Sequence, residues 1–217
     1  MTDLFLIRHS IKMRLPITGK TAEFDLMHPL SVEGEERAKM LLDFPELRNA
    51  DFAVASNMSR ALATLRYLIE ADHVPYRIDD RLREMPAWKR PGSGDPDQPP
   101  RWPDPYERID GGESIMDCRQ RMEAAIIDAV NAYPDKKILV GSHGRSIGAY
   151  LSGILDDFGD EFVPNINSPD VFHLTFDGET IVAYDRLDMP FPLPARDSFH
   201  RGKHGPDLRP PGFVANT

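Results

Sequence analysis

Three short, unbroken apolar runs stand out along the chain. They cover residues 4–7, 52–55 and 138–140, and each is followed at once by polar residues. Apolar runs of this length without polar alternation are typical of strands that are buried on both faces, as in parallel sheets. The pattern therefore predicts three strands in the interior of a sheet.

Stretches with helical spacing of apolar residues lie between and after these runs. Ser31 can cap a helix over about 32–43, and a second helix is expected to start near Ser59. A third is expected from about Glu113 to Tyr133, and a fourth from Arg145 to about Ile154. Strands that alternate with helices predict a three-layer α/β/α sandwich with a mostly parallel central sheet.

Two parts of the chain break this alternation. Residues 90–110 are dense in proline, glycine and aspartate, which predicts an insertion that either covers a site or merely connects two elements. Asp177–Gly178 between two apolar runs, 171–176 and 179–184, predicts a β-hairpin. We therefore expect one domain over 1–188 and a proline-rich tail over 189–217.

Composition narrows the class of protein. The 217 residues carry a formal net charge of −9, which argues against a nucleic-acid surface, because binding a phosphate backbone needs a basic face. Cys118 is the only cysteine and is expected to be a buried spectator rather than a reactive thiol. With neither a signal peptide nor a membrane span in the pattern, we expect a cytoplasmic protein without a membrane partner; homo-oligomerisation stays open.

The residues after the three apolar runs share one chemistry. Arg8 and His9 follow the first run, Arg60 lies just beyond the second, and His143 follows the third. Because the carboxyl ends of parallel strands meet at one edge of a sheet, these side chains are expected to lie together. Guanidinium groups suit phosphate oxygens, and an imidazole can attack phosphorus or carry a proton. The sequence therefore predicts a phosphoryl-transfer site.

Such a site also needs a proton donor for the departing alcohol, and Glu84 is the candidate. Taken singly, each of these residues is more often an ordinary polar strand end or a solvated charge, so the prediction rests on their coincidence. A zinc site on His9 and His143 is the alternative. It is disfavoured because arginines flank both histidines and no HExxH or CxxC pattern is present.

Six segments in order resemble the histidine phosphatase superfamily, in its phosphoglycerate-mutase-like branch. Leu4-Phe5-Leu6-Ile7-Arg8-His9-Ser10 is similar to that family's Arg-His-Gly strand end, and Val140-Gly141-Ser142-His143-Gly144 is similar to its second histidine strand end. The other four segments are 28–38, 55–64, 82–84 and 112–121. The resemblance covers most of residues 3–155 and implies the phosphoglycerate-mutase-like fold.

The resemblance implies a role for each matching residue. His9 would be the nucleophile that becomes phosphohistidine, and Glu84 would be the general acid and base. Arg8, Arg60 and His143 would bind the phosphoryl oxygens, with Ser10 and Gly144 beside them. In another branch of the superfamily an aspartate follows the second histidine and serves as the acid; Gly144 stands there instead, which favours Glu84 in that role. The family uses no metal, and no cofactor is implied.

Two departures from the family pattern bear on activity. Ser10 replaces the family glycine, which can crowd the substrate or alter the turn. Residues 11–15 lack the acidic residue, serine and asparagine that help phosphoglycerate mutases hold substrate; Lys12 and Arg14 either bind a second anionic group or are merely solvated. We therefore expect a hydrolase of a small phosphorylated metabolite, with a mutase and a non-catalytic phosphate-ester-binding protein as the alternatives.

Overall fold

The computed structural model describes residues 1–13, 26–85, 104–108, 112–154 and 166–191. A mixed sheet with strand order β3-β2-β4-β1-β5-β6 runs through the described part. The first four strands of that order are parallel, β5 is antiparallel to β1, and β6 is antiparallel to β5. The strands are β1 Thr2–Arg8, β2 Phe52–Ser56, β3 Tyr76–Asp79, β4 Lys137–Ser142, β5 Asp170–Asp177 and β6 Thr180–Arg186.

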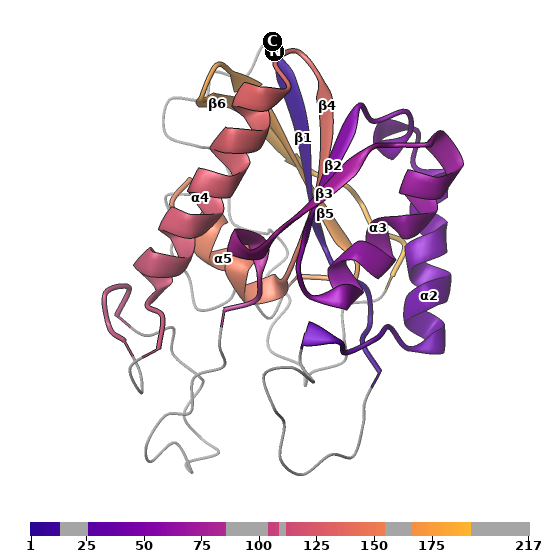
Figure 1. The fold of residues 1–217 in the computed structure, drawn as a ribbon, viewed down its shortest axis with the longest axis horizontal. Helices are drawn as coiled ribbons and strands as arrows, with labels where there is room; N and C mark the ends of the chain where they lie inside the picture. Colours follow the sequence, from indigo (N-terminus) through magenta and orange to yellow (C-terminus); the bar gives the residue numbers. More distant parts are fainter. Residues whose placement is uncertain (14–25, 86–103, 109–111, 155–165, 192–217) are drawn as a thin grey trace.

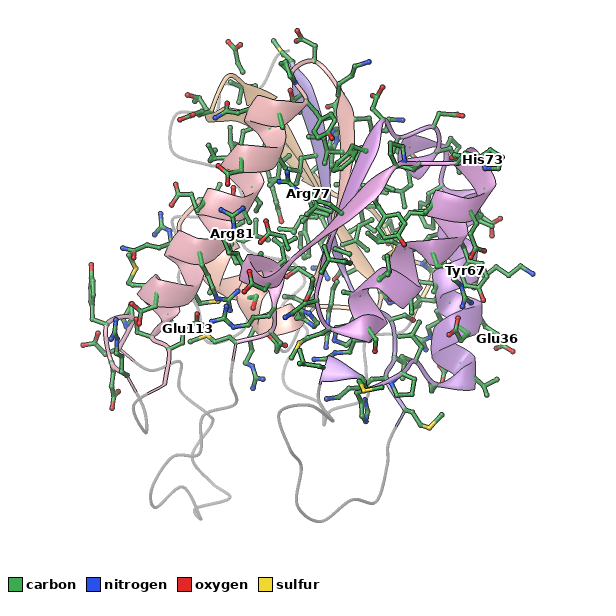
Figure 2. The ribbon with its side chains drawn as sticks, in the orientation of Figure 1. Glu36, Tyr67, His73, Arg77, Arg81 and Glu113 are labelled. Carbon is green, nitrogen blue, oxygen red and sulfur yellow. The ribbon has the colours of Figure 1, made fainter. Side chains whose placement is uncertain are left out.

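Helices cover both faces of the sheet, so the fold is the predicted α/β sandwich (Figure 1). The α-helices are α2 Val32–Lys39, α3 Ser59–Asp72, α4 Ile115–Ala132 and α5 Gly144–Leu151, and the short 3-10 helices are η1 Met40–Asp43, η2 Pro45–Leu47 and η3 Asp80–Leu82. Helices α4 and α5 lie on one face, and α2 and α3 lie on the other (Figure 1). Glu36 lies on α2 and Tyr67 on α3 (Figure 2), and the Tyr67 hydroxyl donates to Glu35 of α2 at 3.1 Å.

Alternate residues of the central strands enter different cores. Leu4 and Leu6 of β1 pack in the cluster that contains α4 and α5, whereas Phe5 and Ile7 pack in the cluster on the α3 side. Both faces of the strand are therefore buried, which is the physical reason why β1, β2 and β4 read as unbroken apolar runs. The three predicted central strands are confirmed.

The edges of the sheet differ from this pattern. Strand β3 was not predicted, because its side chains alternate between exposed and half-buried, as on an edge strand, and Tyr76 and Ile78 are exposed. The predicted hairpin is confirmed as β5 and β6, with Gly178 in the left-handed backbone region at φ 57°.

Helix boundaries follow their capping residues. Ser31 caps α2 by accepting the Gly34 N–H at 3.0 Å, as expected, but the helix tightens to the 3-10 turn η1 over its predicted last four residues. Helix α4 begins one turn after Gly112 with a capping box of Ser114 and Asp117. Helix α5 ends at Leu151, three residues before the predicted end.

The predicted tail starts too early. Met189 and Phe191 are buried, and they pack in the cluster of Phe5 and Ile7, so residues 189–191 belong to the core. Residues 192–217 lie outside the described residues, as does the predicted insertion apart from residues 104–108. Among the helices of the described part, none combines the length and the apolar character needed to cross a membrane.

Candidate active site

The carboxyl ends of β1, β2 and β4 bring the predicted site residues to one edge of the sheet. Strand β4 lies between the other two, with Arg8 of β1 opposite Ser142 and Ala55 of β2 opposite Gly141. His9 donates its backbone N–H to the carbonyl of Ser142 at 2.9 Å. The imidazole rings that follow these strands, His9 and His143, have centroids 5.1 Å apart.

The ring of His9 is buried and held in one tautomer. Its Nδ1 lies 2.6 Å from the carbonyl oxygen of Ser10. A carbonyl oxygen only accepts, so Nδ1 carries the proton and Nε2 of the neutral ring keeps its lone pair. Burial, and then the charges of Arg60 and Arg8, hold the pKa of His9 well below its ordinary value. The ring is therefore neutral near neutral pH, as attack on phosphorus requires.

The partners of His143 allow the complementary tautomer. Its Nε2 lies 2.8 Å from Oγ of Ser56, and that hydroxyl accepts the Met58 N–H at 3.2 Å. The hydroxyl can then donate its own proton to Nε2, which leaves the ring proton on Nδ1. Nδ1 is buried and has no hydrogen-bond partner among the described residues. Burial, followed by the charges of His9 and Arg60, lowers the pKa of His143 well below its ordinary value.

Two buried or half-buried arginines supply positive charge. Arg60, only 2% exposed, lies in the first turn of α3, and its guanidinium approaches Sδ of Met58 at 3.2 Å. Arg8 donates to the carbonyls of Ile166 and, at 3.0 Å, of Asn167. An otherwise acidic protein thus has a local cluster of positive charge beside the two histidines.

Gly144 and Ser10 lie against this group. A Cβ on Gly144 would come within 3.1 Å of Nε of Arg8, so glycine lets the guanidinium pack against the start of α5. Ser10 is fully buried, and its backbone N–H donates to Oγ1 of Thr64 at 2.9 Å. Ser10 is not among the described residues with left-handed backbone, which explains how a serine can occupy the position of the family glycine.

Thr64 and Ser56 hold the site without having been predicted as members of it. Oγ1 of Thr64 also donates to the carbonyl of Arg60 at 2.8 Å and thereby joins α3 to the residue after His9. Serine and threonine are common at such positions, so the only sequence signal was the occurrence of Ser56 and Thr64 around Arg60 in one segment.

Glu84 lies in the loop after η3. Its carboxylate accepts the backbone N–H of Met85 at 2.9 Å and that of Ser146, in the first turn of α5, at 3.1 Å. Its side chain is 15% exposed, and Nε of Arg145 lies 3.9 Å away. The Glu84 N–H points to the same Met58 sulfur that Arg60 touches, at 3.4 Å, so the backbone of this loop lies near Arg60.

The sequence also singled out two basic residues, the cysteine and a metal site. Lys12 pairs with Leu30 in an isolated bridge, and its charge adds to the lowering of the His9 pKa. Arg14 lies outside the described residues. Cys118 is fully buried, and burial raises the pKa of its thiol to about 12, as expected of a spectator. No group of three or more metal-ligating side chains occurs within the described ranges.

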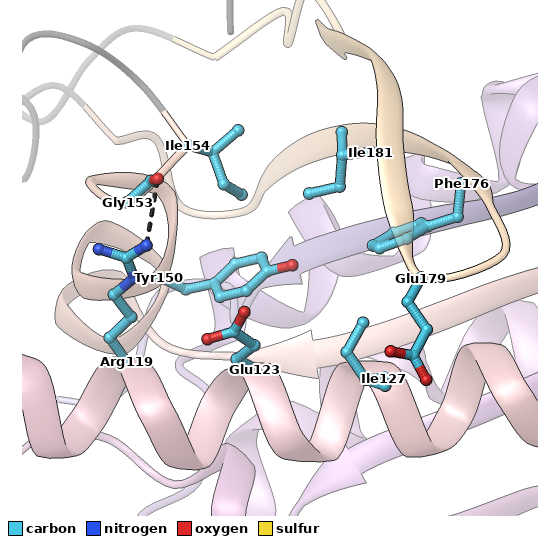
Figure 3. A pocket seen from close by; sticks show the side chains of 9 residues that line it. All are labelled: Arg119, Glu123, Ile127, Tyr150, Gly153, Ile154, Phe176, Glu179 and Ile181. Carbon is cyan, nitrogen blue, oxygen red and sulfur yellow. Dashed lines mark hydrogen bonds between the residues drawn. The ribbon is translucent and has the colours of Figure 1, made fainter. Parts of the chain in front are cut away.

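A hollow lies between α4, the end of α5 and the β5–β6 hairpin, away from the histidine site (Figure 3). Its volume is about 210 Å³, and Arg119 crosses its rim to donate to the carbonyl of Gly153 at 3.2 Å. None of the residues of the histidine site lines it.

Comparison with known proteins gives named relatives over most of the chain. An uncharacterized phosphatase, PhoE, from Bacillus subtilis is 28% identical over 158 residues, covering 71% of this chain and 78% of the relative. A probable phosphoglycerate mutase, GpmB, from an Enterobacter species is 27% identical over 167 residues, covering 71% of this chain and 75% of the relative.

Solved structures share the fold. A mycobacterial glucosyl-3-phosphoglycerate phosphatase superposes with a TM-score of 0.62 at 22% identity, covering 85% of this chain and 96% of that one. A phosphoserine phosphatase variant from Entamoeba histolytica superposes with a TM-score of 0.62 at 18% identity, with the same coverage of 85% and 96%.

A family model for the histidine phosphatase superfamily (branch 1) matches residues 4–183, which span all six strands of the sheet up to the middle of β6. The matched range includes both histidines, both arginines and Glu84. The chain belongs to the histidine phosphatase superfamily, branch 1.

Proposed function

We propose that the protein is a metal-independent phosphomonoesterase that hydrolyses a small phosphorylated metabolite through a phosphohistidine at His9. The observation that carries the proposal is the state of His9: a buried neutral imidazole with Nδ1–H bound to the Ser10 carbonyl, beside Arg8 and Arg60. Pure phosphate binding needs no neutral, oriented imidazole among cations, because a charged one would bind the anion better. This argues against a non-catalytic binding protein.

In the first step Nε2 of His9 attacks phosphorus, and the bond from phosphorus to the ester oxygen breaks. Glu84 gives its proton to the departing oxygen, so the alcohol leaves neutral. Arg8, Arg60 and Nδ1–H of His143 bind the equatorial phosphoryl oxygens, where negative charge is spread in the transition state.

In the second step water attacks the phosphohistidine while Glu84, now a carboxylate, takes a proton from the water. The bond from nitrogen to phosphorus breaks, phosphate leaves, and His9 returns to the neutral state with Nδ1 still bound to the Ser10 carbonyl. The two steps restore the proton on Glu84, so no external acid, base or metal is consumed.

The test is free-phosphate release from a panel of phosphate monoesters with a chelator present. We expect release that the chelator does not reduce, that disappears in His9→Ala, and that persists in His173→Ala, a matched change outside the site on β5. Phosphate release that the chelator abolishes, or equal release from the His9→Ala variant, contradicts the proposal.

The second candidate function is a phosphoryl-transferring mutase, because one named relative is a probable phosphoglycerate mutase. A mutase returns the phosphoryl group to the substrate, so an isomeric ester accumulates instead of free phosphate. Product analysis by phosphorus NMR on the same panel separates the two. A cytoplasmic location, and the absence of nucleic-acid and membrane partners, remain predictions.

A further inference from the structure

Ser146 contacts three consecutive residues of the loop that carries Glu84. Its hydroxyl donates to the carbonyl of Arg83 at 2.7 Å and accepts the N–H of Met85 at 2.9 Å. Its own backbone N–H donates to the Glu84 carboxylate at 3.1 Å. Ser146 is fully buried, so solvent does not replace these bonds when they break.

The position of Ser146 also ties this loop to the second histidine. His143 is the N-cap of α5, and Ser146 lies in the first turn, whose backbone N–H groups have no acceptor within the helix. The Glu84 carboxylate accepts one of these N–H groups at the positive end of the helix. The start of α5 therefore positions both His143 and the carboxylate of Glu84.

Helix α4 holds Ser146 from the other side. Arg121 approaches the Ser146 hydroxyl at 3.4 Å and is itself fixed by Glu113, with nitrogen–oxygen distances of 2.5 and 2.8 Å. Arg121 also donates to the carbonyl of Arg81 in η3, just before the same loop. Glu113 and Arg81 lie on the α4 side of the molecule (Figure 2). The serine is therefore held in one place by buried or half-buried partners.

We propose that Ser146 is the positioning residue for the general acid: it fixes the carboxyl group of Glu84 at the leaving-group side of the phosphoryl site. The inference rests on the proposed role of Glu84. Loss of the hydroxyl leaves the Arg83 carbonyl without this donor and removes one of the two acceptors of the Met85 N–H, which lets the loop move. The group of His9, Arg8, Arg60 and His143 keeps its own hydrogen bonds.

The experiment compares Ser146→Ala with the native chain on esters of rising leaving-group pKa, from nitrophenyl to alkyl phosphates. We expect kcat/KM for the alkyl ester to fall about tenfold or more relative to the nitrophenyl ester, because only the poor leaving group needs the proton. Inhibition by inorganic phosphate is expected to be unchanged. The ratio between two esters does not depend on the folded fraction of the sample.

Two further variants make the result specific. Ser152→Ala removes a hydroxyl from the other end of α5, where it donates to the carbonyl of Ala149 at 2.7 Å, and it is expected to keep the native ratio. Glu84→Gln is expected to shift the ratio in the same direction as Ser146→Ala and further. If Ser146→Ala does not fold, Ser146→Cys retains the volume and a weak donor, and it is expected to shift the ratio less.

The failures are distinguishable. If Glu84→Gln shifts the ratio and Ser146→Ala lowers all esters equally, the positioning role is wrong while the proposed function stands. If Glu84→Gln leaves the ratio native, the acid is another group, and both the role of Glu84 and the inference built on it are wrong. If the native chain releases no phosphate from any ester, the proposed function itself is wrong.

Discussion

The pair of buried neutral histidines makes the stability of the fold sensitive to mild acid. His9 and His143 both have a pKa well below the ordinary value of 6.5, first of all because burial disfavours the charged ring. In the unfolded chain both rings titrate near that ordinary value. At a pH between the folded-state and the unfolded-state pKa of a ring, the unfolded chain binds more protons than the native chain. The stabilisation from the neutral ring is therefore fully present above pH 6.5 and is lost as the pH is lowered.

The magnitude follows from proton linkage. One group that stays neutral in the native state loses about 1.4 kcal/mol of stabilisation per pH unit below its unfolded pKa. Between about pH 7.5 and about pH 5.5 each ring that stays neutral therefore costs roughly 1 kcal/mol, and the pair costs roughly 2–3 kcal/mol. That is a large part of the roughly 5–15 kcal/mol that separates folded from unfolded domains.

Urea unfolding at the two pH values measures this loss. We expect His9→Gln and His143→Gln each to lose roughly 1 kcal/mol less on acidification than the native chain. His73→Asn is the control, because His73 is exposed at the end of α3 in left-handed backbone that asparagine also adopts (Figure 2). If the native chain and all three variants lost the same free energy of unfolding on acidification, the claim that the two rings are neutral in the native state would be refuted.

Three further outcomes follow from named contacts. Gly144→Ala is expected to raise KM and weaken inhibition by inorganic phosphate without unfolding the protein, because the new Cβ would meet Nε of Arg8 at 3.1 Å; steady-state kinetics with unchanged phosphate inhibition would contradict it. Thr64→Val keeps the volume but leaves the buried Ser10 N–H without its acceptor, so urea unfolding is expected to show a loss of about 1–3 kcal/mol. Cys118 is buried with its thiol pKa raised to about 12, so an alkylating reagent at neutral pH is expected to label it only in denaturant, and rapid labelling of the folded chain would show the environment to be wrong.

The central sheet and the edge that carries the candidate site were predictable because burial on both faces leaves a signal in the sequence. Strands β1, β2 and β4 have no polar face, and the candidate site residues lie within a few positions of the end of each strand. Strand β3 lies at the edge of the sheet, and its side chains alternate between exposed and half-buried. The sequence pattern of its four residues therefore does not differ from that of a connecting segment.

The hydrogen-bond partners of the site were not predictable in the same way. The roles of Ser56, Thr64 and Ser146 depend on distances between elements that are far apart in the chain, such as the 2.8 Å contact between Ser56 and His143. Ser146 follows His143 by three positions, which places it in the first turn of the helix, but only the packing of the Glu84 loop there reveals its contacts. Likewise, the burial of Phe191 depends on the far face of the sheet and not on its proline-rich neighbours.

The central claim is that the phosphoryl group passes through His9, and trapping the intermediate tests it most directly. Glu84→Gln should slow the attack of water more than the loss of a good leaving group, so with a nitrophenyl phosphate the intermediate should accumulate. We predict an alkali-stable, acid-labile phosphoryl group on the peptide that contains His9, absent from Glu84→Gln combined with His9→Ala. Continued phosphate release with no phosphoryl group on His9, or with the label on another residue, would contradict the account.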